Sequence, residues 1–326
     1  MRATWLGSGS KPRFGRQSRK KRSFAISEPT RTLVFTDLDG TLLDHHFYSW
    51  EGAGPALAEL RRRGVPLIFC TSKTRAEVVA LRRTIGNTHP FIVENGGAIV
   101  IPAGYFRSVA PAAARAKNYT LMLGRPYEEL IRGLREIAQR SGVDVCGFHQ
   151  MTAEAVARAT GLTLREARMA QQREAGEPFI FRNASAAGIR NFRRLAHKCG
   201  YSVQKGGRFW HFAGGHDKGL AMSALIGFYR VAWGTRIRTI ALGDSGNDLL
   251  MLQLVDLPIL MPKPNGSFAK EVTAKIPHVG RAKQPGSAGW GHALLQALGG
   301  SGKVTQKNKL RTGRTPDQTR PLQSRR

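Results

Sequence analysis

Short, uninterrupted apolar runs alternate with segments of helical periodicity along much of this chain. The runs 32–37, 65–70 and 90–93 are each typical of a buried strand, and the helical stretches 54–64 and 74–83 lie between them. Strands without polar alternation have both faces covered, as in a parallel sheet between two layers of helices. The sequence therefore predicts an α/β fold with a Rossmann-like parallel sheet as its core.

Local signals place the ends of these elements. Thr74 and Glu77 have the Thr-x-x-Glu spacing of a capping box, and Gly64 is typical of a helix stop. The same alternation returns late in the chain. We expect helices at 217–230 and 247–255 and strands at 237–244 and 257–261.

Between these two parts the pattern changes to longer helices and paired strands. We expect this segment to be an inserted α+β cap at 105–207, with a core formed by 31–104 and 208–300. The elements predicted here are helices 125–142, 163–176 and 188–200, a strand at 177–182, and a hairpin over 201–212 that turns at 206–207.

The charge is strongly basic, with a formal net charge of +29. The segments 1–30 and 301–326 each hold eight Lys or Arg against one acid, and both are predicted to be disordered basic tails. The basic body is compatible with an anionic ligand, with nucleic acid, or with an arginine-rich proteome. The sequence has no interleaved aromatic and basic platform, which disfavours nucleic acid as the partner.

The cysteines and apolar stretches bear on the compartment. Cys70, Cys146 and Cys199 are widely spaced and form no CxxC pair, which favours a reducing environment without structural zinc. No apolar stretch approaches the length of about 18 residues that a membrane span needs. The start is rich in Arg and Ser, as in a transit peptide, but we interpret it as a disordered tail and expect a cytoplasmic protein.

Polar residues follow the predicted strands at the edge where ligands bind in such sheets. Asp37 and Asp39 end the first strand and, being two apart in an extended segment, face the same way. Thr71 and Ser72 end the second strand, just before a helix amino end, and Asp244 ends a late strand. Three carboxylates at one edge repel each other unless a cation lies among them, and oxygen ligands suit Mg²⁺. With Lys218 and the hydroxyl and amide donors of 71–72, they describe a phosphoryl site.

Four motifs in order carry a resemblance that covers about residues 31–300. "DLDGTLL", "TSKT", "HDKG" and "GDSGND" resemble the four motifs of the haloacid dehalogenase-like phosphatases. The position of the insert, between the second and third motifs, resembles the subgroup with a large α+β cap. The runs "CTSKTRAEV", "PFIVENGGAIVIPAGYF" and "GGRFWHFAGGHDKG" are similar to the mannosyl-3-phosphoglycerate phosphatases within that family.

The resemblance implies roles for the residues that match its motifs. Asp37 would be the nucleophile that forms an aspartyl-phosphate, and Asp39 the general acid and then base. Lys218 would be the catalytic cation, and Thr71, Ser72 and Gly40 would bind the phosphate. Mg²⁺ would be held by the Asp37 carboxylate, the Asp39 carbonyl and Asp244, which Asn247 and Asp248 would orient.

The expected substrate is a small anionic phosphorylated glycoside, 2-O-mannosyl-3-phosphoglycerate, which yields mannosylglycerate and phosphate. Alternatives are the glucosyl analogue, a broader range of sugar phosphates, a phosphosugar mutase, and a nucleic-acid-binding protein built on an inactive scaffold. A phosphoglycerate also has a carboxylate, for which Lys73, Arg75 and Arg208 are the candidate cations. Asn95, in "ENGG", either contacts the substrate or fixes the turn.

Overall fold

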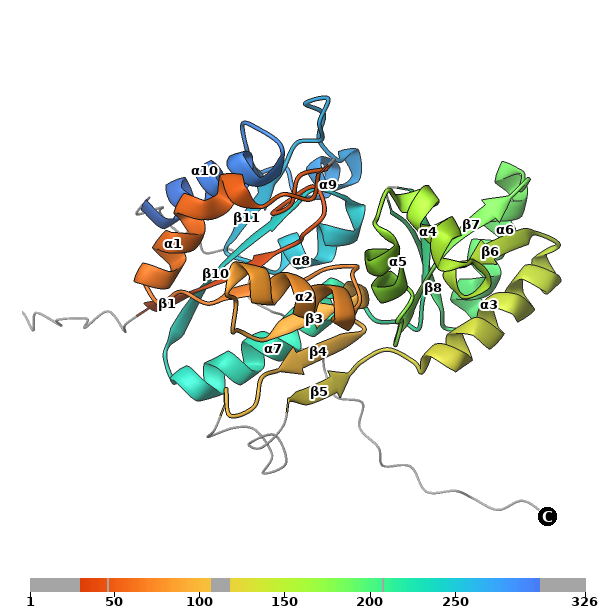
Figure 1. Ribbon diagram of the computed structural model, residues 1–326, viewed down its shortest axis with the longest axis horizontal. Coiled ribbons are helices and arrows are strands. Elements are labelled where there is room, and N and C mark those ends of the chain that lie inside the picture. Colours follow the sequence, from red (N-terminus) through yellow and green to blue (C-terminus); the bar gives the residue numbers. More distant parts are fainter. Residues whose placement is uncertain (1–29, 46, 107–117, 207, 300–326) are drawn as a thin grey trace, which may run out of the picture.

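The computed structural model describes residues 30–45, 47–106, 118–206 and 208–299. It consists of a larger α/β unit and a smaller unit beside it (Figure 1). Apart from Thr30, the two segments that we predicted to be disordered tails lie outside the described residues.

The larger unit is built on a parallel sheet. Its strands are β1 (Thr30–Thr36), β2 (Leu67–Phe69), β10 (Arg236–Gly243), β11 (Leu257–Leu260) and β12 (Gly280–Arg281). The strand order is β12-β11-β10-β1-β2, and every pair is parallel. A single parallel bridge from Cys70 to Ile92 places β3 (Phe91–Val93) next to β2. The parallel core predicted from the apolar runs is thereby confirmed.

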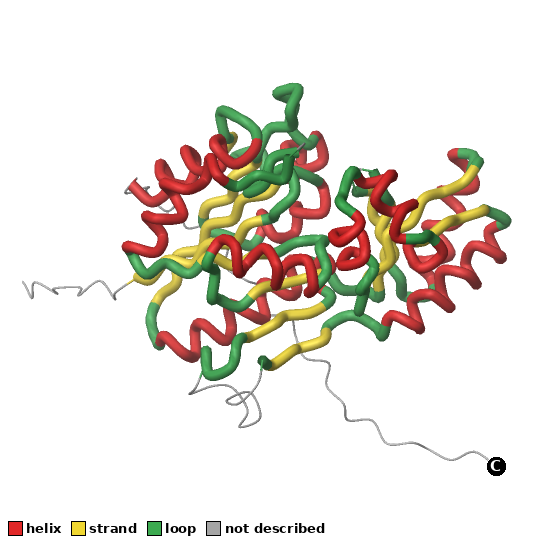
Figure 2. The backbone as a smooth tube through the Cα atoms, viewed as in Figure 1, coloured by secondary structure: helices red, strands yellow, loops and turns green. Residues whose placement is uncertain are grey.

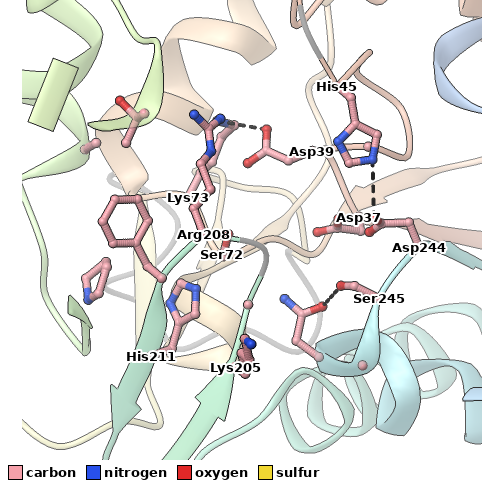
Figure 3. Close-up of a pocket in the computed structure, with 18 of the residues that line it drawn as sticks. Asp37, Asp39, His45, Ser72, Lys73, Lys205, Arg208, His211, Asp244 and Ser245 are labelled. Carbon is pink, nitrogen blue, oxygen red and sulfur yellow. Dashed lines mark hydrogen bonds and ion pairs between the residues drawn. The ribbon is translucent and has the colours of Figure 1, made fainter. Parts of the chain in front are cut away.

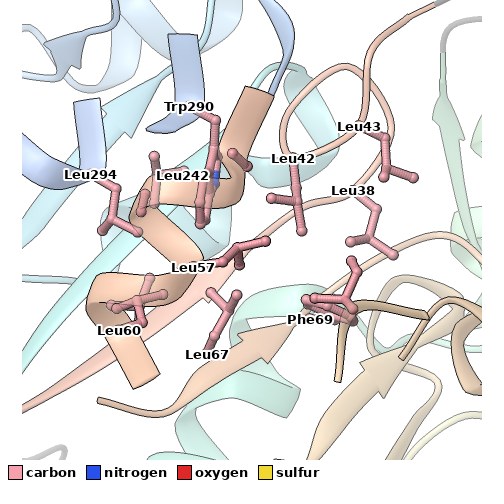
Figure 4. Packing of buried hydrophobic residues seen from close by; sticks show 14 of the residues in the cluster. Leu38, Leu42, Leu43, Leu57, Leu60, Leu67, Phe69, Leu242, Trp290 and Leu294 are labelled. Carbon is pink, nitrogen blue, oxygen red and sulfur yellow. The ribbon is translucent and has the colours of Figure 1, made fainter. Parts of the chain in front are cut away.

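Helices cover both faces of this sheet. One face carries α1 (Gly54–Arg62), α2 (Arg75–Ile85) and α10 (Gly286–Gly299), and the other carries α7 (Lys218–Trp233), α8 (Leu249–Gln253) and α9 (Lys270–Lys275). Figure 4 shows Trp290 of α10 and Leu57 of α1 packed over the first face. Trp290 is fully buried, and its indole Nε1 donates to Thr36 Oγ1 of β1 at 2.9 Å. Burial of large apolar side chains on both faces fixes the sheet that positions the site.

The smaller unit is the α+β cap. Its strands are β6 (Asp144–Gly147), β7 (Gly176–Arg182), β8 (Ser202–Lys205) and β9 (Trp210–Ala213), and its helices are α3 (Tyr127–Ser141), α4 (Ala153–Thr160), α5 (Leu164–Ala170) and α6 (Ala186–Lys198). The sheet is antiparallel, in the order β6-β7-β9-β8. Helices α3 and α6 pack on it around Phe179, Phe192 and Phe212. A separate apolar cluster, which includes Phe148 and Val156, joins α4 and α5. Figure 2 shows the helices and strands of both units along the backbone.

Strand pairing corrects the cap boundaries of 105–207. Strand β5 (Tyr119–Met122) pairs with β4 (Ala98–Ile101), which itself pairs with β3 in a three-stranded antiparallel sheet of the larger unit. Strand β9 pairs with β7 and β8 and so belongs to the cap. The cap therefore begins after β5 and ends with β9. The predicted start at 105 is too early because β5 is hydrogen-bonded as a third strand to the β3–β4 hairpin of the core, which turns at "ENGG".

One predicted helix is shorter than expected. The capping box of Thr163 and Glu166 is present, but α5 ends at Ala170 instead of 176. The amides that would continue the helix bond locally instead, with Gln172 donating to the Met169 carbonyl and Arg173 to the Gln171 carbonyl. Farther along, the amides of Glu174, Ala175 and Gly176 donate to the carboxylate of Glu94. The box of Thr74 and Glu77 also forms, at the start of α2.

Helix α10 was not predicted, because its sequence contains several glycines, which have low helix propensity. Close packing explains why small residues are needed there. The helix lies against the short turn η1 (Glu51–Ala53). A Cβ on Gly291 of the helix would lie 3.2 Å from the Gly52 carbonyl oxygen, and one on Gly52 would lie 2.7 Å from the Ala288 nitrogen.

Among the described residues, no helix is both long and apolar enough to cross a membrane. All three cysteines are free thiols, with Cys70 and Cys146 buried and Cys199 half-buried.

Candidate active site

Three neighbouring strands of the core sheet end in polar residues at one edge. Asp37 directly follows β1, Asp244 directly follows β10, and Ser72 lies shortly after β2. Because these strands are adjacent and parallel, their carboxyl ends meet. The amide of Asp37 donates to the Leu242 carbonyl at 2.9 Å, which ties the first two segments together.

Lys218, the first residue of α7, is buried beneath this edge with 1% exposure. Its Nζ donates to Oδ1 of Asp37 at 2.6 Å and to Oδ1 of Asp248 at 2.7 Å. Burial alone would lower the pKa of Lys218, but the charges of Asp248 and Asp37 outweigh burial and raise the pKa above its ordinary value. Lys218 is therefore a constant positive charge next to the Asp37 carboxylate.

Asp37, Asp244 and Asp248 form a buried carboxylate cluster whose oxygens lie within 4.8 Å of one another. Burial raises the pKa of Asp37 to about 7 and also raises the pKa of Asp244. Burial thus disfavours the ionised form of both carboxyl groups, and a cation bound between them would favour it. An all-oxygen donor set beside an open cavity suits a hard divalent cation. The residues therefore fit a metal ion of this kind.

Within this cluster, both carboxylate oxygens of Asp248 have protein partners. Oδ1 accepts from Lys218, and Oδ2 accepts from the amides of Asp244 at 3.0 Å and Ser245 at 3.1 Å. Asp248 therefore orients Lys218 and the Asp244 loop, while Asp37 and Asp244 are better placed to bind a cation.

Gly40 lets the chain turn close to these carboxylates. Its φ is +74°, and a Cβ at this position would lie 2.6 Å from His45 Nε2 and 2.9 Å from Asp244 Oδ2. His45 Nε2 is itself 3.8 Å from Asp244 Oδ2. Any side chain at position 40 would displace one of these two groups, which explains the glycine.

Asp39 has a different environment from Asp37. Its side chain is 39% exposed, and its Oδ1 lies 3.0 Å from Nζ of Lys73. Lys73 also lies 3.5 Å from the Glu77 carboxylate. Two carboxylates that are two residues apart thus differ in burial, a difference that allows neighbouring carboxyl groups to take separate roles in catalysis.

A cavity of about 440 Å³ lies between this edge and the cap. Figure 3 shows Asp37, Asp39 and Asp244 of the core across from Lys205 and His211 of the cap strands. Apolar residues of the cap, which include Phe148 and Phe209, line the same space. A ligand bound here would contact carboxylates, cations and apolar surface at once.

Comparison with known proteins identifies the family. The model of the haloacid dehalogenase-like hydrolases matches residues 34–115. A protein of Methanococcoides burtonii, named glucosyl-3-phosphoglycerate/mannosyl-3-phosphoglycerate phosphatase, is 41% identical over 276 residues, which cover 83% of this chain and 99% of the relative. The chain belongs to the haloacid dehalogenase-like hydrolases. A protein of Persephonella marina with the same name is 37% identical over 268 residues, which cover 82% of this chain and 97% of the relative.

The fold is also that of solved haloacid dehalogenase-like structures. A sugar phosphatase of subclass IIB of the superfamily superposes with a TM-score of 0.57 at 16% identity, covering 82% of this chain and 99% of that chain. This likeness agrees with the predicted arrangement of a Rossmann-like core and an inserted cap.

The two residues predicted to bind the phosphate through their hydroxyl groups have different surroundings in this hydrolase. Ser72 lines the cavity, whereas Thr71 is fully buried and its Oγ1 accepts from the Lys73 amide at 3.2 Å. Both lie next to the amino end of α2, which is a favourable place for an anion.

The candidate substrate residues also have different surroundings. Arg208 lines the cavity and donates to the Tyr48 hydroxyl at 3.1 Å, and Lys73 lines the cavity between its two carboxylates. Arg75 instead pairs with Glu174 at 2.7 Å. Asn95 is buried, and its Oδ1 accepts from Asn247 Nδ2 at 3.2 Å, a contact that joins the turn at 94–96 to the loop after Asp244.

Sequence reasoning missed several residues that line the cavity. Lys263 follows β11 at the same sheet edge, so the strand-end rule could have found it. Lys205 lies at the tip of the predicted hairpin. Arg173 and Tyr48 are in loops, and no local pattern marks them.

Proposed function

We propose that this hydrolase is a Mg²⁺-dependent phosphatase that converts 2-O-mannosyl-3-phosphoglycerate to mannosylglycerate and phosphate. The buried Asp37–Lys218 pair, beside a cavity that also contains exposed cations of the cap, is the observation that carries the proposal. The names of the two relatives support a glycosyl-3-phosphoglycerate as substrate. Because those names include the glucosyl compound, glucosyl-3-phosphoglycerate is the second candidate substrate.

In the proposed reaction, the Asp37 carboxylate attacks phosphorus, and the bond between phosphorus and the glycerate oxygen breaks. Asp39 donates its proton to that leaving oxygen. In the second half, Asp39 takes a proton from water, the water oxygen attacks phosphorus, and the bond to Asp37 breaks to release phosphate. Lys218 stays charged throughout and holds the Asp37 carboxylate in place.

The metal part of the proposal assigns the binding oxygens to Asp37, Asp244 and the Asp39 carbonyl. When bound, Mg²⁺ would neutralise charge on the phosphoryl oxygens. Asn247 and Asp248 would keep the Asp244 loop in position, as supporting hydrogen bonds do around metal ligands.

Chelation with EDTA is expected to abolish phosphate release, and added Mg²⁺ to restore it. Asp244→Ala should raise the Mg²⁺ concentration for half-maximal rate by at least about tenfold, because a ligand is lost. The measurement is the rate as a function of free Mg²⁺. Asp144→Ala, which removes an exposed carboxylate of the cap, is the matched control. Undiminished activity of Asp244→Ala in chelator would exclude the metal.

The carboxylate of the substrate needs a cation that is not already paired. Lys73 contacts two carboxylates, and Arg75 is bound to Glu174, whereas Arg208 contacts only neutral oxygens of Tyr48 and Ala159 in the hydrogen bonds seen among the described residues. Arg208 therefore becomes the main candidate of the three, with Lys205 beside it in the cavity.

Arg208→Gln is expected to raise KM for the glycosyl phosphoglycerate about ten- to a hundredfold, since a hydrogen bond between charged groups contributes about 1.5–3 kcal/mol. The KM for a sugar phosphate without a carboxylate should change far less. Arg165→Gln, at an exposed position of α5, provides the control. An equal rise in KM for both substrates would mean that Arg208 does not bind the carboxylate of the substrate.

A phosphate-release screen over phosphorylated glycosides with Mg²⁺ tests the function directly. The expected result is preference for mannosyl- or glucosyl-3-phosphoglycerate over simple hexose phosphates. Salt-sensitive RNA binding without phosphate release would favour the alternative of a nucleic-acid-binding protein. Three free cysteines support a reducing compartment, and we propose the cytoplasm.

A further inference from the structure

Glu94 joins the core to the cap through a buried carboxylate. The residue belongs to the turn η2 (Glu94–Gly96) after β3, and its side chain is 0% exposed. It accepts from three successive amides of the cap, those of Glu174 at 2.8 Å, Ala175 at 2.9 Å and Gly176 at 2.8 Å. Both oxygens of this carboxylate are therefore hydrogen-bonded without water, Oε1 by one amide and Oε2 by two. The start of β7 is thus fixed to the core at one point.

Arg173 extends this contact to the turn at the candidate phosphate site. Its Nε lies 3.5 Å from Glu94 Oε2 and donates to the Gly176 carbonyl at 3.0 Å. Its Nη2 donates to the Ser72 carbonyl at 3.1 Å. The guanidinium is 4% exposed and lines the cavity. A cap side chain therefore holds a backbone atom of the residue that faces the proposed phosphate.

The turn at 71–73 also has hydrogen bonds to residues of the core. The amide of Glu94 donates to the Lys73 carbonyl at 3.0 Å, and the amide of Asn95 donates to the Thr71 carbonyl at 2.8 Å. Glu94 and Asn95 have φ values of +51° and +56°, which residues with side chains rarely adopt. A strained backbone persists where surrounding contacts determine it, and such positions gather at functional sites.

We propose that Glu94 and Arg173 are positioning residues that make the docked cap a structural part of the phosphate-binding turn at 71–73. This inference rests on the proposed phosphatase function. Glu94 holds the cap segment that carries Arg173, and Arg173 holds Ser72. Docking of the cap and affinity for the phosphoryl group are therefore coupled, although neither residue needs to touch the substrate.

The test is the affinity of the full-length protein for inorganic phosphate in the presence of Mg²⁺, measured by calorimetry. Arg173→Met and Glu94→Gln are each expected to weaken phosphate binding about tenfold, the size of one hydrogen bond to a charged group. Arg173→Lys should also weaken phosphate binding, because one ammonium group cannot replace the planar guanidinium that donates to the carbonyls of both Ser72 and Gly176. The double variant Glu94→Gln/Arg173→Met should be no weaker than the poorer single variant, since both act through one contact.

Glu174→Gln is the matched control, because it removes the charge from a different contact between cap and core, the ion pair with Arg75, and leaves the backbone amide in place. It should bind phosphate like the wild type. If Arg173→Lys and Glu94→Gln lowered the melting temperature but bound phosphate normally, the contacts would be purely structural and the inference wrong. A wild-type protein that neither binds phosphate nor releases it from any substrate would instead remove the proposed function.

Discussion

Asp37→Asn is expected to reduce phosphate release to background. Removal of a covalent nucleophile costs on the order of 10⁶-fold in kcat in a well-studied serine protease, and an amide oxygen is a far poorer nucleophile than a carboxylate. The fold should persist, because the change is nearly isosteric and Lys218 keeps its partner Asp248. Steady-state phosphate release and trapping of the phosphoenzyme by rapid quench and mass spectrometry measure the two effects.

Asp39→Asn should give a different result from its neighbour. It leaves the nucleophile in place and removes the proton donor, a loss of about 10²–10⁴-fold. The loss of rate in Asp39→Asn should be smaller for a substrate whose leaving group needs no proton, such as p-nitrophenolate. A phosphoenzyme should therefore still form with p-nitrophenyl phosphate in Asp39→Asn but not in Asp37→Asn.

Asp44→Asn supplies the control for both changes. It lies in the same loop, but its carboxylate accepts from the amide of Ser287 at 3.0 Å and lies outside the cavity lining. Its activity should stay within a few-fold of wild type. Wild-type turnover by Asp37→Asn would show that the covalent route is wrong.

The core was predictable because its signals are local. Uninterrupted apolar runs marked β1, β2 and β10, and the spacing of Thr74 and Glu77 marked the start of α2. The ends of adjacent parallel strands then determined which residues would meet, so Asp37, Ser72 and Asp244 could be placed at one edge. Apart from the pairing of the strands in the sheet, these predictions depend on no contact between distant segments.

The remainder depends on contacts between distant segments. The helix predicted at 163–176 stops at Ala170, and the amides of Glu174 and Ala175 donate instead to Glu94, about 80 residues away. Helix α10 forms despite its glycines because Trp290 is buried against Thr36. Arg173 reaches Ser72 across the boundary between cap and core. No periodicity or spacing in the sequence encodes such pairs.

Lys218→Met is expected to lower the free energy of unfolding by about 3–5 kcal/mol, as loss of one partner from a buried ion pair does. The side chain is fully enclosed and lies between two buried carboxylates, at 2.6 Å from Asp37 and 2.7 Å from Asp248. Methionine fills a similar volume, so the cost comes from the two charges that it leaves without a cation. Urea unfolding in EDTA measures this cost without any contribution from a bound metal.

Lys73→Met is the matched control, because Lys73 also contacts two carboxylates, at 3.0 and 3.5 Å. One of its partners, Asp39, is 39% exposed, so water can solvate that charge. The other, Glu77, is 9% exposed but keeps the hydrogen bonds from the amide and hydroxyl of Thr74, and the expected cost is about 1 kcal/mol. Adding Asp248→Asn to Lys218→Met should recover part of the lost stability, since one of the two stranded charges is then gone. Mg²⁺ should also stabilise Lys218→Met, because a cation that binds only the folded state adds to its stability by mass action. Equal losses for Lys218→Met and Lys73→Met would mean that burial of the Asp37 and Asp248 charges is not what makes Lys218 indispensable.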